Sequence, residues 1–406
     1  MQNKVFVDLG QQPVANDYII PGEDPRQGTF FNLAMARDKD TGLCTLIENI
    51  PHEEVYDETY VYHSSGSETM RKHFRNAAKD LDKLYGPKRV LEIGSNDGAF
   101  LFNWEPSVAE SVEPCGNFAE ITSEAGYFTL PNFWDYHILS RLGGKKYDLI
   151  YSANCICHIE DIDQTFYAAS ESLTEDGVFV FEDPSLLQML KRGSYDQLYV
   201  EHVHMFSVFA LQRALRKAGL EIIRVEHLDV HGGSNRIHAS KIAAQKFIDS
   251  SVERALKEEI GYGIHSNRAT DTFGERVLRS KSNLVNMLKT YKEQGKKIVS
   301  YGATAKSVTV FNYCGIGPDL IDYIIDNTKA KQGKLQPGTG IPVQAPENGD
   351  RGIAEDVDIV FLGAWNFSKE ILEKEKDFIK RGGIFVTHVP NPMELTSAEE
   401  HLQLVK

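Results

Sequence analysis

The chain has 406 residues, of which 41% are hydrophobic and 25% charged, enough apolar material for two or three domains. Its formal net charge is −14 and it contains no run rich in Lys or Arg, which argues against a nucleic-acid-binding protein. No apolar run approaches the roughly 20 residues of a membrane span, and the first residues lack the pattern of a secretory signal. We therefore expect a cytoplasmic protein with no membrane partner.

The first half of the sequence predicts a small module followed by an α/β domain. Residues 1–70 contain short strand-like runs broken by Pro, Gly and Asp, which indicate a β-rich module. In residues 71–240, a helix over 71–86 precedes buried strands that alternate with helices, a pattern typical of a parallel sheet. The predicted strands are 88–93, 109–114, 147–154 and 177–183.

The second half predicts a connector and another α/β domain. Residues 241–294 are highly charged with helical periodicity, and 295–406 contain a second series of strands and helices. Its predicted strands are 296–302, 320–327, 357–364 and 382–389. The predicted fold class is thus α/β, with two α/β domains behind the N-terminal module.

The stretch "EIGSNDG" forms a glycine-containing loop between a buried strand and a predicted helix. Asn96 stands where the dinucleotide fingerprint has its middle glycine, so the loop does not suit the pyrophosphate of NAD. Glu92 and Glu113 end neighbouring strands, and Glu113 is positioned to bind ribose hydroxyls. These features favour S-adenosylmethionine, with a tight turn that binds nothing as the alternative. The cofactor-binding candidates are Glu92, Gly94, Asn96, Asp97, Gly98, Glu113 and Asn154.

Two separate strand ends bring reactive side chains to the carboxyl edge of the first sheet, where ligands bind in open α/β folds. "NCICHIED" supplies His158, and "LYVEHVHMF" supplies Tyr199, Glu201 and His202. A histidine can accept a proton at neutral pH, and a tyrosine or second histidine can hydrogen-bond a developing oxyanion. This convergence predicts an acid–base centre.

Two other interpretations of these histidines remain open. A metal site would use His158, Glu201, His202 and His204, and a purely structural role would have each ring bonded to backbone groups. If residues 198–206 were extended, Tyr199 and Glu201 would share one face and the two histidines the other. The cysteines at 44, 115, 155, 157 and 314 are odd in number and lack zinc-ribbon spacing, which favours reduced thiols over disulfides or structural zinc.

Six motifs in order resemble one known family: "EIGSNDG", "VEPCGN", "NCICHIED", "YVEH", "HGGSNR" and "YGATAKSVTVFNYCGI". The chain is similar over essentially its whole length to the sugar C-methyltransferases of deoxysugar biosynthesis, which use S-adenosylmethionine on nucleotide-linked 4-keto-deoxysugars. The resemblance implies an N-terminal zinc-binding module, a Rossmann-like methyltransferase domain and a C-terminal Rossmann-like domain that helps bind the nucleotide-sugar.

The resemblance also implies roles for individual residues. The catalytic base falls on His202, which would remove the C3 proton made acidic by the C4 ketone, with Tyr199, Glu201 and His158 around the sugar. A further tyrosine of "YVYHSSGS" would come from the N-terminal side, Tyr62 in the first place and otherwise Tyr60. The enolate oxygen would receive a hydrogen bond from His158 or Tyr199, and no metal is required for this chemistry.

The resemblance fails at the zinc site. The family's module holds zinc with two C-x-x-C pairs, whereas this chain keeps Cys44 alone. We predict that no zinc binds and that packing holds the module together, which leaves the preferred substrate open because the module borders the active site.

A second loop between a strand and a helix, "SYGATAKS", suits an anionic group at the helix amino end beside Lys306. We assign it to the nucleotide or diphosphate of the substrate, with an unliganded turn as the alternative. "HGGSNR" would bring backbone and Arg236 near the sugar, and loop 327–342, with three lysines, would cover the nucleotide. The substrate-binding candidates are Tyr60, His231, Arg236, Tyr301, Gly302, Ala303 and Lys306.

The leading hypothesis is therefore C3 methylation of a nucleoside-diphosphate 4-keto-deoxysugar. The alternatives are a nicotinamide-dependent oxidoreductase or isomerase of nucleotide sugars, and a non-catalytic binding protein. We expect a monomer or a weak homo-oligomer.

Overall fold

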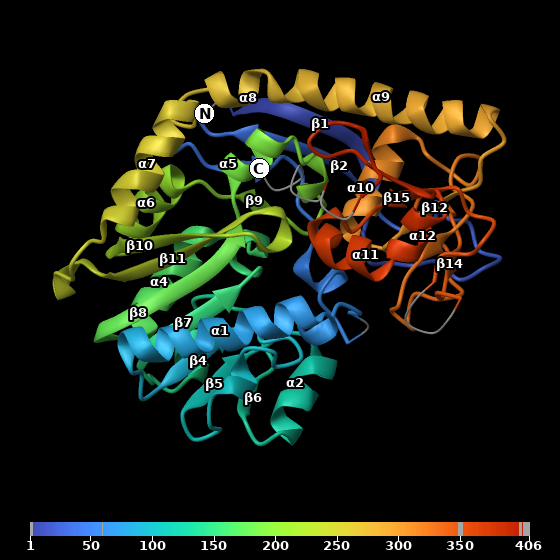
Figure 1. The fold of residues 1–406 in the computed structure, drawn as a ribbon. Helices are drawn as coiled ribbons and strands as arrows, with labels where there is room; N and C mark the ends of the chain where they lie inside the picture. The colour runs from blue at the N-terminus through green and yellow to red at the C-terminus, as the bar shows by residue number, and fades with distance from the viewer. Residues whose placement is uncertain (1–2, 59, 348–351, 398–399, 401–406) are drawn as a thin grey trace.

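The computed structural model describes residues 3–58, 60–347, 352–397 and 400, and their strands form three sheets (Figure 1). The outermost residues of the predicted N-terminal module and C-terminal domain thus lie outside the described residues. Among the described helices, none is both long and apolar enough to cross a membrane.

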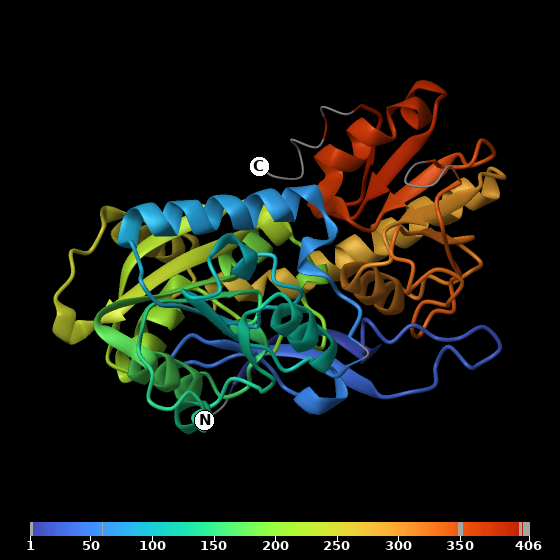
Figure 2. The same cartoon turned by 90° about the horizontal axis from the view of Figure 1, so that it is seen from below.

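The N-terminal sheet is antiparallel, in the order β1-β2-β3-β9. Its strands are β1 (Lys4–Pro13), β2 (Phe30–Arg37), β3 (Cys44–Leu46) and β9 (His204–Met205). The last strand comes from the middle of the chain and pairs Thr45 with His204. Seen from below, the N-terminal strands extend from the seven-stranded sheet towards the C-terminal one (Figure 2). The sheet therefore joins the parts of the molecule on either side of it.

The second sheet has seven strands in the order β10-β11-β8-β7-β4-β5-β6. The strands β4 (Val90–Ile93), β5 (Ala109–Val112), β6 (Phe128–Leu130), β7 (Tyr147–Ala153) and β8 (Leu173–Pro184) run parallel. The strand order reverses between β4 and β7, which places a ligand site at their carboxyl ends. The helices of this part are α1 (Glu68–Tyr85), α2 (Gly116–Glu124), α3 (Ile138–Arg141), α4 (Ile162–Ser172), α5 (Leu186–Arg192) and α6 (Val208–Lys217).

Two features of this sheet differ from the sequence prediction. The strands β10 (Leu220–Leu228) and β11 (Ser234–Lys241), which add an antiparallel pair to the sheet, were not predicted. The helix expected after the glycine loop is only a 3-10 turn, Leu101–Asn103. Pro106 explains the short turn, because proline stops a helix and pushes the residue before it into an extended conformation.

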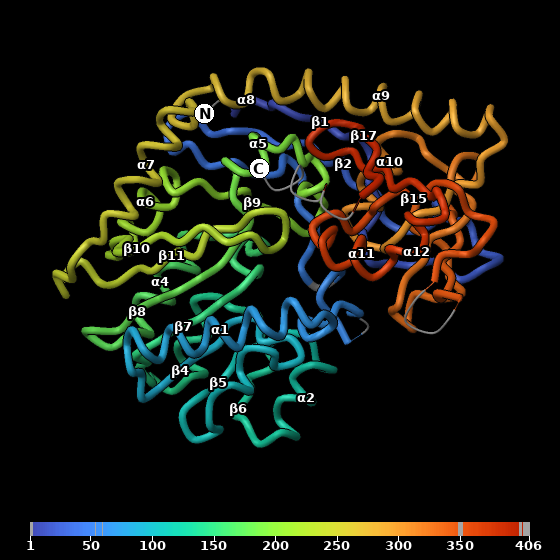
Figure 3. Tube along the Cα trace, in the orientation of Figure 1, coloured from blue at the N-terminus to red at the C-terminus, as the bar shows by residue number. Residues whose placement is uncertain are grey.

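The helical connector follows the seven-stranded sheet as α7 (Ser250–Tyr262), α8 (Arg268–Asp271) and α9 (Phe273–Glu293). The trace in Figure 3 shows these helices one after another along an edge of the molecule, with α9 above β1. The connector thus spans the distance between the two α/β parts.

The third sheet has the order β14-β13-β12-β15-β16-β17, parallel except for β17. Its strands are β12 (Ile298–Tyr301), β13 (Ile324–Ile325), β14 (Val343–Gln344), β15 (Ile359–Leu362), β16 (Ile384–Thr387) and β17 (Met393–Leu395). The helices are α10 (Ala305–Cys314), α11 (Ser368–Lys374) and α12 (Lys376–Lys380). The strand predicted over 320–327 is reduced to its two central isoleucines.

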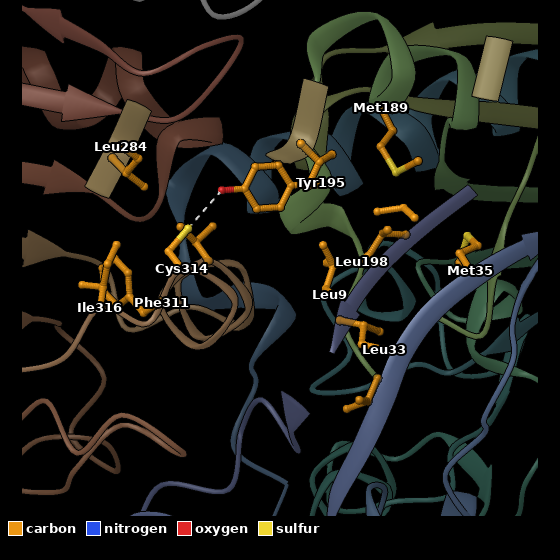
Figure 4. Packing of buried hydrophobic residues seen from close by; sticks show 14 of the residues in the cluster. Leu9, Leu33, Met35, Met189, Tyr195, Leu198, Leu284, Phe311, Cys314 and Ile316 are labelled. Carbon is orange, nitrogen blue, oxygen red and sulfur yellow. Dashed lines mark hydrogen bonds between the residues drawn. The ribbon is translucent and has the colours of Figure 1, made fainter. Parts of the chain in front are cut away.

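One apolar core connects the N-terminal sheet, α5, the connector helix α9 and the third sheet. Side chains from β1, β2, α5, α9 and α10 pack together, and the Tyr195 hydroxyl lies 3.6 Å from Cys314 Sγ within that core (Figure 4). Burial of large side chains from three regions of the sequence in one cluster stabilises the positions of the sheets relative to one another.

Candidate active site

Two neighbouring cavities lie at the carboxyl edge of the seven-stranded sheet. The first lies beside the turn after β4 and the ends of β5 and β7, and the second between this edge and the amino end of α10. Residues that line both cavities are Tyr60, Tyr62, Asn154, His158 and His231. A molecule in the first cavity can therefore meet a molecule in the second across these side chains.

The turn after β4 supports the first cavity through an unusual backbone. Gly94 has φ +71°, and a Cβ there would lie 2.8 Å from Cys155 Sγ, so only glycine fits without displacement. Asn96 has φ 48°, and its backbone N–H donates to Glu113 Oε2 at 2.7 Å. Gly94, Asn96 and Glu113, three of the cofactor-binding candidates, line this cavity, and because Glu113 occupies the Asn96 amide, that amide is not free for a phosphate.

The N-terminal segment closes over this turn. Asp97 accepts a 2.6 Å hydrogen bond from the Ser65 hydroxyl, and Asn96 Nδ2 donates to the Tyr62 carbonyl at 3.0 Å. Asp97 is therefore occupied in fixing the segment and does not line either cavity.

Two other cofactor candidates also lie outside the cavity linings. Glu92 is buried beneath the turn, where burial and the neighbouring Glu113 raise its pKa well above the usual value. Gly98 has φ +81°, and a Cβ there would meet the Phe102 ring at 2.5 Å. These residues shape the turn from behind.

His202 is held in one chemical form by its surroundings. Its Nδ1 lies 2.7 Å from the carbonyl oxygen of Gln197, and a carbonyl only accepts hydrogen bonds, so Nδ1 carries the proton. Burial, together with the nearby positive charge of Lys306, lowers the pKa of His202 well below its usual value. His202 is therefore neutral, with a lone pair on Nε2, and it lines the second cavity.

Tyr199 and His158 flank His202 on the same wall. The ring centroids of Tyr199 and His202 are 3.8 Å apart, and those of His158 and His202 are 5.1 Å apart. The segment is a turn, in which the His202 N–H donates to the Tyr199 carbonyl at 2.9 Å, so the extended alternative is wrong. Burial lowers the pKa of His158 to about 3, which keeps this ring neutral as well.

Glu201 points away from the cavities. It is buried, it lines neither cavity, and Asn16 Nδ2 lies 3.5 Å from its Oε1. Burial raises its pKa to about 7. Its side chain supports the wall behind Tyr199 and His202.

The metal site that the sequence left as an alternative does not form in the structure. His204 accepts from the Thr45 hydroxyl at Nδ1 (3.0 Å) and donates from Nε2 to the Glu160 carbonyl at 3.1 Å, so both of its ring nitrogens are occupied. A different group, Cys157, His158 and His202, places its ligand atoms within 4.8 Å of one another. Burial raises the pKa of the Cys157 thiol well above its usual value, and a protonated thiol is a poor ligand at neutral pH.

The second cavity has a cationic end at α10. Ala303 and Lys306, two of the substrate-binding candidates, line it, and Lys306 Nζ donates to Gln197 Oε1 at 3.0 Å. Lys331, from the predicted covering loop, also lines it and donates to the Ala303 carbonyl at 2.8 Å. Thr304 caps the helix.

Three substrate candidates lie outside both cavity linings. Arg236 forms ion pairs with Glu182 (2.7 Å) and Glu226 (3.1 Å) inside the sheet. Tyr301 donates to Glu375 at 3.1 Å, behind the loop. A Cβ on Gly302 would lie 2.8 Å from Ala364 Cβ, so this glycine permits close packing of two loops.

Several residues of the site carry little signal in the sequence. Cavity-lining residues not predicted as such include Asn16, His52, Tyr56, Phe133, Trp134, Gln197 and Lys331. They come from loops and short 3-10 turns, where no hydrophobic periodicity marks an inward-facing position. Two features of the sequence could have indicated such residues: the lysines of loop 327–342 and the polar "SYDQ" before the "YVEH" motif.

Two family models match consecutive parts of the chain. Residues 68–225 match one described as "Methyltransferase domain", and residues 229–390 match one described as "C-methyltransferase C-terminal domain". The C-methyltransferase NovU of Streptomyces niveus is 30% identical over 403 residues, which cover 98% of this chain and 95% of NovU.

Solved structures with some similarity cover less than half of this chain. A possible histamine N-methyltransferase of Thermotoga maritima is 22% identical with a TM-score of 0.33, covering 42% of this chain and 88% of that one. The CcbJ methyltransferase of Streptomyces caelestis is 15% identical with a TM-score of 0.34, covering 41% and 89%.

Proposed function

The chain belongs to the C-methyltransferases that use S-adenosylmethionine, and from this premise we propose that it methylates C3 of a nucleoside-diphosphate 4-keto-deoxysugar. The observation that carries the proposal is the neutral His202, which lines the second cavity and has a lone pair on Nε2. Membership of this family favours methyl transfer over the nicotinamide-dependent oxidoreduction or isomerisation that the sequence left as an alternative.

The first cavity suits the methyl donor. S-adenosylmethionine supplies, when bound, a methyl group on a positively charged sulfur. The Glu113 carboxylate at the end of β5 is positioned for ribose hydroxyls, and Asn154 stands at the passage to the second cavity. The aromatic rings of Tyr60, Phe133 and Trp134 provide apolar surface for an adenine base.

The second cavity suits a carbon acid with an anionic tail. The C4 ketone acidifies the C3 hydrogen, and His202 Nε2 would accept that proton while the C–H electron pair forms the enolate and the carbonyl pair moves to oxygen. His158 or Tyr199 would then donate a hydrogen bond to the oxygen. The enolate carbon would face the first cavity across His158.

The cations at α10 fit the diphosphate of such a substrate. Lys306 and Lys331 both line the second cavity, and the backbone N–H groups of Ala305 and Lys306 have no acceptor among the described residues. Free amides at a helix amino end attract anions, and two nearby ammonium groups strengthen that attraction. Asp326, on the same wall, would select against a second anion.

The direct test is mass spectrometry of the protein incubated with S-adenosylmethionine and a panel of nucleotide-linked 4-keto-deoxysugars. We expect a gain of one methyl group on at least one sugar, together with one equivalent of S-adenosylhomocysteine. If no 4-keto sugar of the panel gains a methyl group while the protein binds S-adenosylmethionine, the proposed substrate class is wrong.

We predict that His202→Asn abolishes methyl transfer and leaves the affinity for S-adenosylmethionine within about twofold. Asparagine can still donate to the Gln197 carbonyl but has no basic nitrogen, so a loss of at least about 100-fold in kcat is expected. The matched control is His238→Asn, a buried histidine that contacts Tyr85 away from both cavities and should retain turnover. Undiminished turnover in His202→Asn would remove this residue from the base role.

A further inference from the structure

The hydroxyl of Tyr56 lies 2.5 Å from Nδ1 of His158, with the two rings stacked at a centroid distance of 5.6 Å. Tyr56 was not among the residues singled out from the sequence. Burial, with Tyr60 and Glu201 nearby, raises the pKa of Tyr56 well above its usual value, so its hydroxyl keeps its proton. No other acceptor for that proton exists among the described residues, and His158 Nδ1 therefore accepts it.

A neutral imidazole that accepts at Nδ1 carries its own proton at Nε2. The Nε2 atom of His158 is enclosed and has no hydrogen-bond partner among the described residues. A buried N–H without an acceptor is unfavourable, so this group is prepared to donate to a ligand oxygen. His158 lines both cavities, which places that donor where the two bound molecules would meet.

His202 has the opposite arrangement. The Gln197 carbonyl fixes its proton on Nδ1 and leaves Nε2 as a lone pair. Gln197 itself is held on both sides, because its amide oxygen accepts from Lys306 Nζ at 3.0 Å and its amide nitrogen donates to the His231 carbonyl. The orientation of His202 is therefore fixed by groups that cannot exchange donor and acceptor roles.

We propose that the Tyr56 hydroxyl and the Gln197 carbonyl hold His158 and His202 in opposite tautomers, so that His202 accepts the substrate proton and His158 donates to the enolate oxygen. This inference rests on the proposed function for the identity of the substrate oxygen. It makes Tyr56 a positioning residue and selects His158 over Tyr199 as the oxyanion donor. In the step itself, the substrate C–H bond breaks, its proton moves to His202 Nε2, and the His158 N–H bond stays intact.

The tautomers are measurable without any substrate. Long-range ¹H–¹⁵N spectra of the full chain labelled with ¹⁵N-histidine distinguish a protonated ring nitrogen from one with a lone pair. His158→Gln and His202→Gln assign the two sets of signals by their disappearance. We expect the proton of His158 on Nε2 and that of His202 on Nδ1; a protonated Nδ1 on His158 would overturn the inference.

Tyr56→Phe removes the donor and keeps the ring. We expect the Nδ1 signal of His158 to shift, the His202 signals to stay, and kcat to fall roughly tenfold, about 1.4 kcal/mol in the barrier, with KM changed less than twofold. The matched control is Tyr85→Phe, because the Tyr85 hydroxyl lies 2.8 Å from Nδ1 of His238, the same type of contact away from both cavities. This control should shift only the His238 signal and keep kcat.

The outcomes separate this inference from the proposed function. If no sugar is methylated but the tautomers are as expected, the substrate proposal fails and the tautomer assignment stands. If Tyr56→Phe lowers kcat without any change at His158 Nδ1, or changes neither, the positioning role is wrong.

Discussion

At the scale of single residues, the most unusual group beside the site is the carboxyl of Glu201. The residue is 4% exposed, and its Oε2 has no hydrogen-bond partner among the described residues. The positive charge of Lys331 favours the ionised form of this carboxyl, against the effect of burial. Burial raises its pKa to about 7, against about 4.3 for an exposed glutamate. The folded chain thus keeps a proton on Glu201 at pH values where the unfolded chain has lost it.

This shift predicts how Glu201→Gln changes stability with pH. Because the folded-state pKa is raised, the contribution of the carboxyl is fully present below the unfolded value and is lost as pH rises through about 7. In thermal unfolding we expect the variant to differ little from the wild type at pH 5 and to gain at pH 8, by roughly 1–2 °C per kcal/mol of burial cost removed in a chain of this length.

Glu226→Gln is the matched control for this measurement. The His238 imidazole, whose Nε2 lies 3.2 Å from Glu226 Oε1, lowers the pKa of Glu226 to about 2, so the contribution of this carboxylate is present at both pH 5 and pH 8 and is lost only in stronger acid. Its removal should lower the melting temperature equally at the two pH values. A gain of Glu201→Gln that is the same at pH 5 and pH 8 would contradict the raised pKa.

The sequence predicts which residue types follow the ends of the strands, but it does not predict the direction in which their side chains point. His158 and His202 converge because both follow parallel strands, which sequence patterns indicate. Glu201 faces inward and Tyr56 enters from a loop, and both facts depend on packing between distant segments. No periodicity encodes such contacts.

At the scale of elements, the turn between β4 and β5 combines strain with function. Gly94 and Asn96 adopt left-handed backbone conformations, and Asn96 is tied to the N-terminal segment as well as to Glu113. A change in this turn therefore disturbs the first cavity and its cover together.

We predict that Gly94→Ala raises the dissociation constant for S-adenosylmethionine at least tenfold, measured by isothermal titration calorimetry. The new Cβ would lie 2.8 Å from Cys155 Sγ, and displacing either group changes the cavity. Gly219→Ala is the control, since Gly219 has φ +75° but open space around its Cβ. Both variants should lose about 1–2 kcal/mol of stability, and only Gly94→Ala should lose affinity. Equal affinity in the two variants would show that the turn does not contact the cofactor.

The elements that were missed have a common physical cause. The strands β10 and β11 carry Arg224, Glu226, Arg236 and His238, which make them look exposed. The ion pairs of Arg236 with Glu182 and Glu226 neutralise these charges across neighbouring strands, so a buried strand tolerates them. Such compensation appears only when the strands are placed side by side.

At the scale of the whole molecule, the N-terminal sheet is held by packing with the rest of the protein. Cys44 lies in the shared apolar core, where burial raises the pKa of its thiol to about 12, so it is a hydrophobic side chain rather than a metal ligand. The connection between β1 and β2 also contacts the connection between β13 and β14, where Ile19 forms an antiparallel bridge with Leu335.

We predict that the purified protein contains no stoichiometric zinc, measured by inductively coupled plasma mass spectrometry after dialysis against metal-free buffer. Chelators should leave the melting temperature unchanged within about 1 °C, because no structural metal would contribute to folding. One zinc per chain would contradict the conclusion that the N-terminal module, without its cysteine pairs, binds no zinc.

The strand β9 begins two residues after His202 and completes the N-terminal sheet through its pairing with β3. Exchanging N-terminal modules between relatives to alter sugar preference is therefore not a matter of joining parts at a linker. In a chimera, a β3 strand from another protein would pair with His204 and Met205. A mismatch in that pairing would displace the backbone next to it and with it the His202 imidazole. Grafts that also carry over the donor's residues at 203–206 should keep turnover where simple fusions lose it.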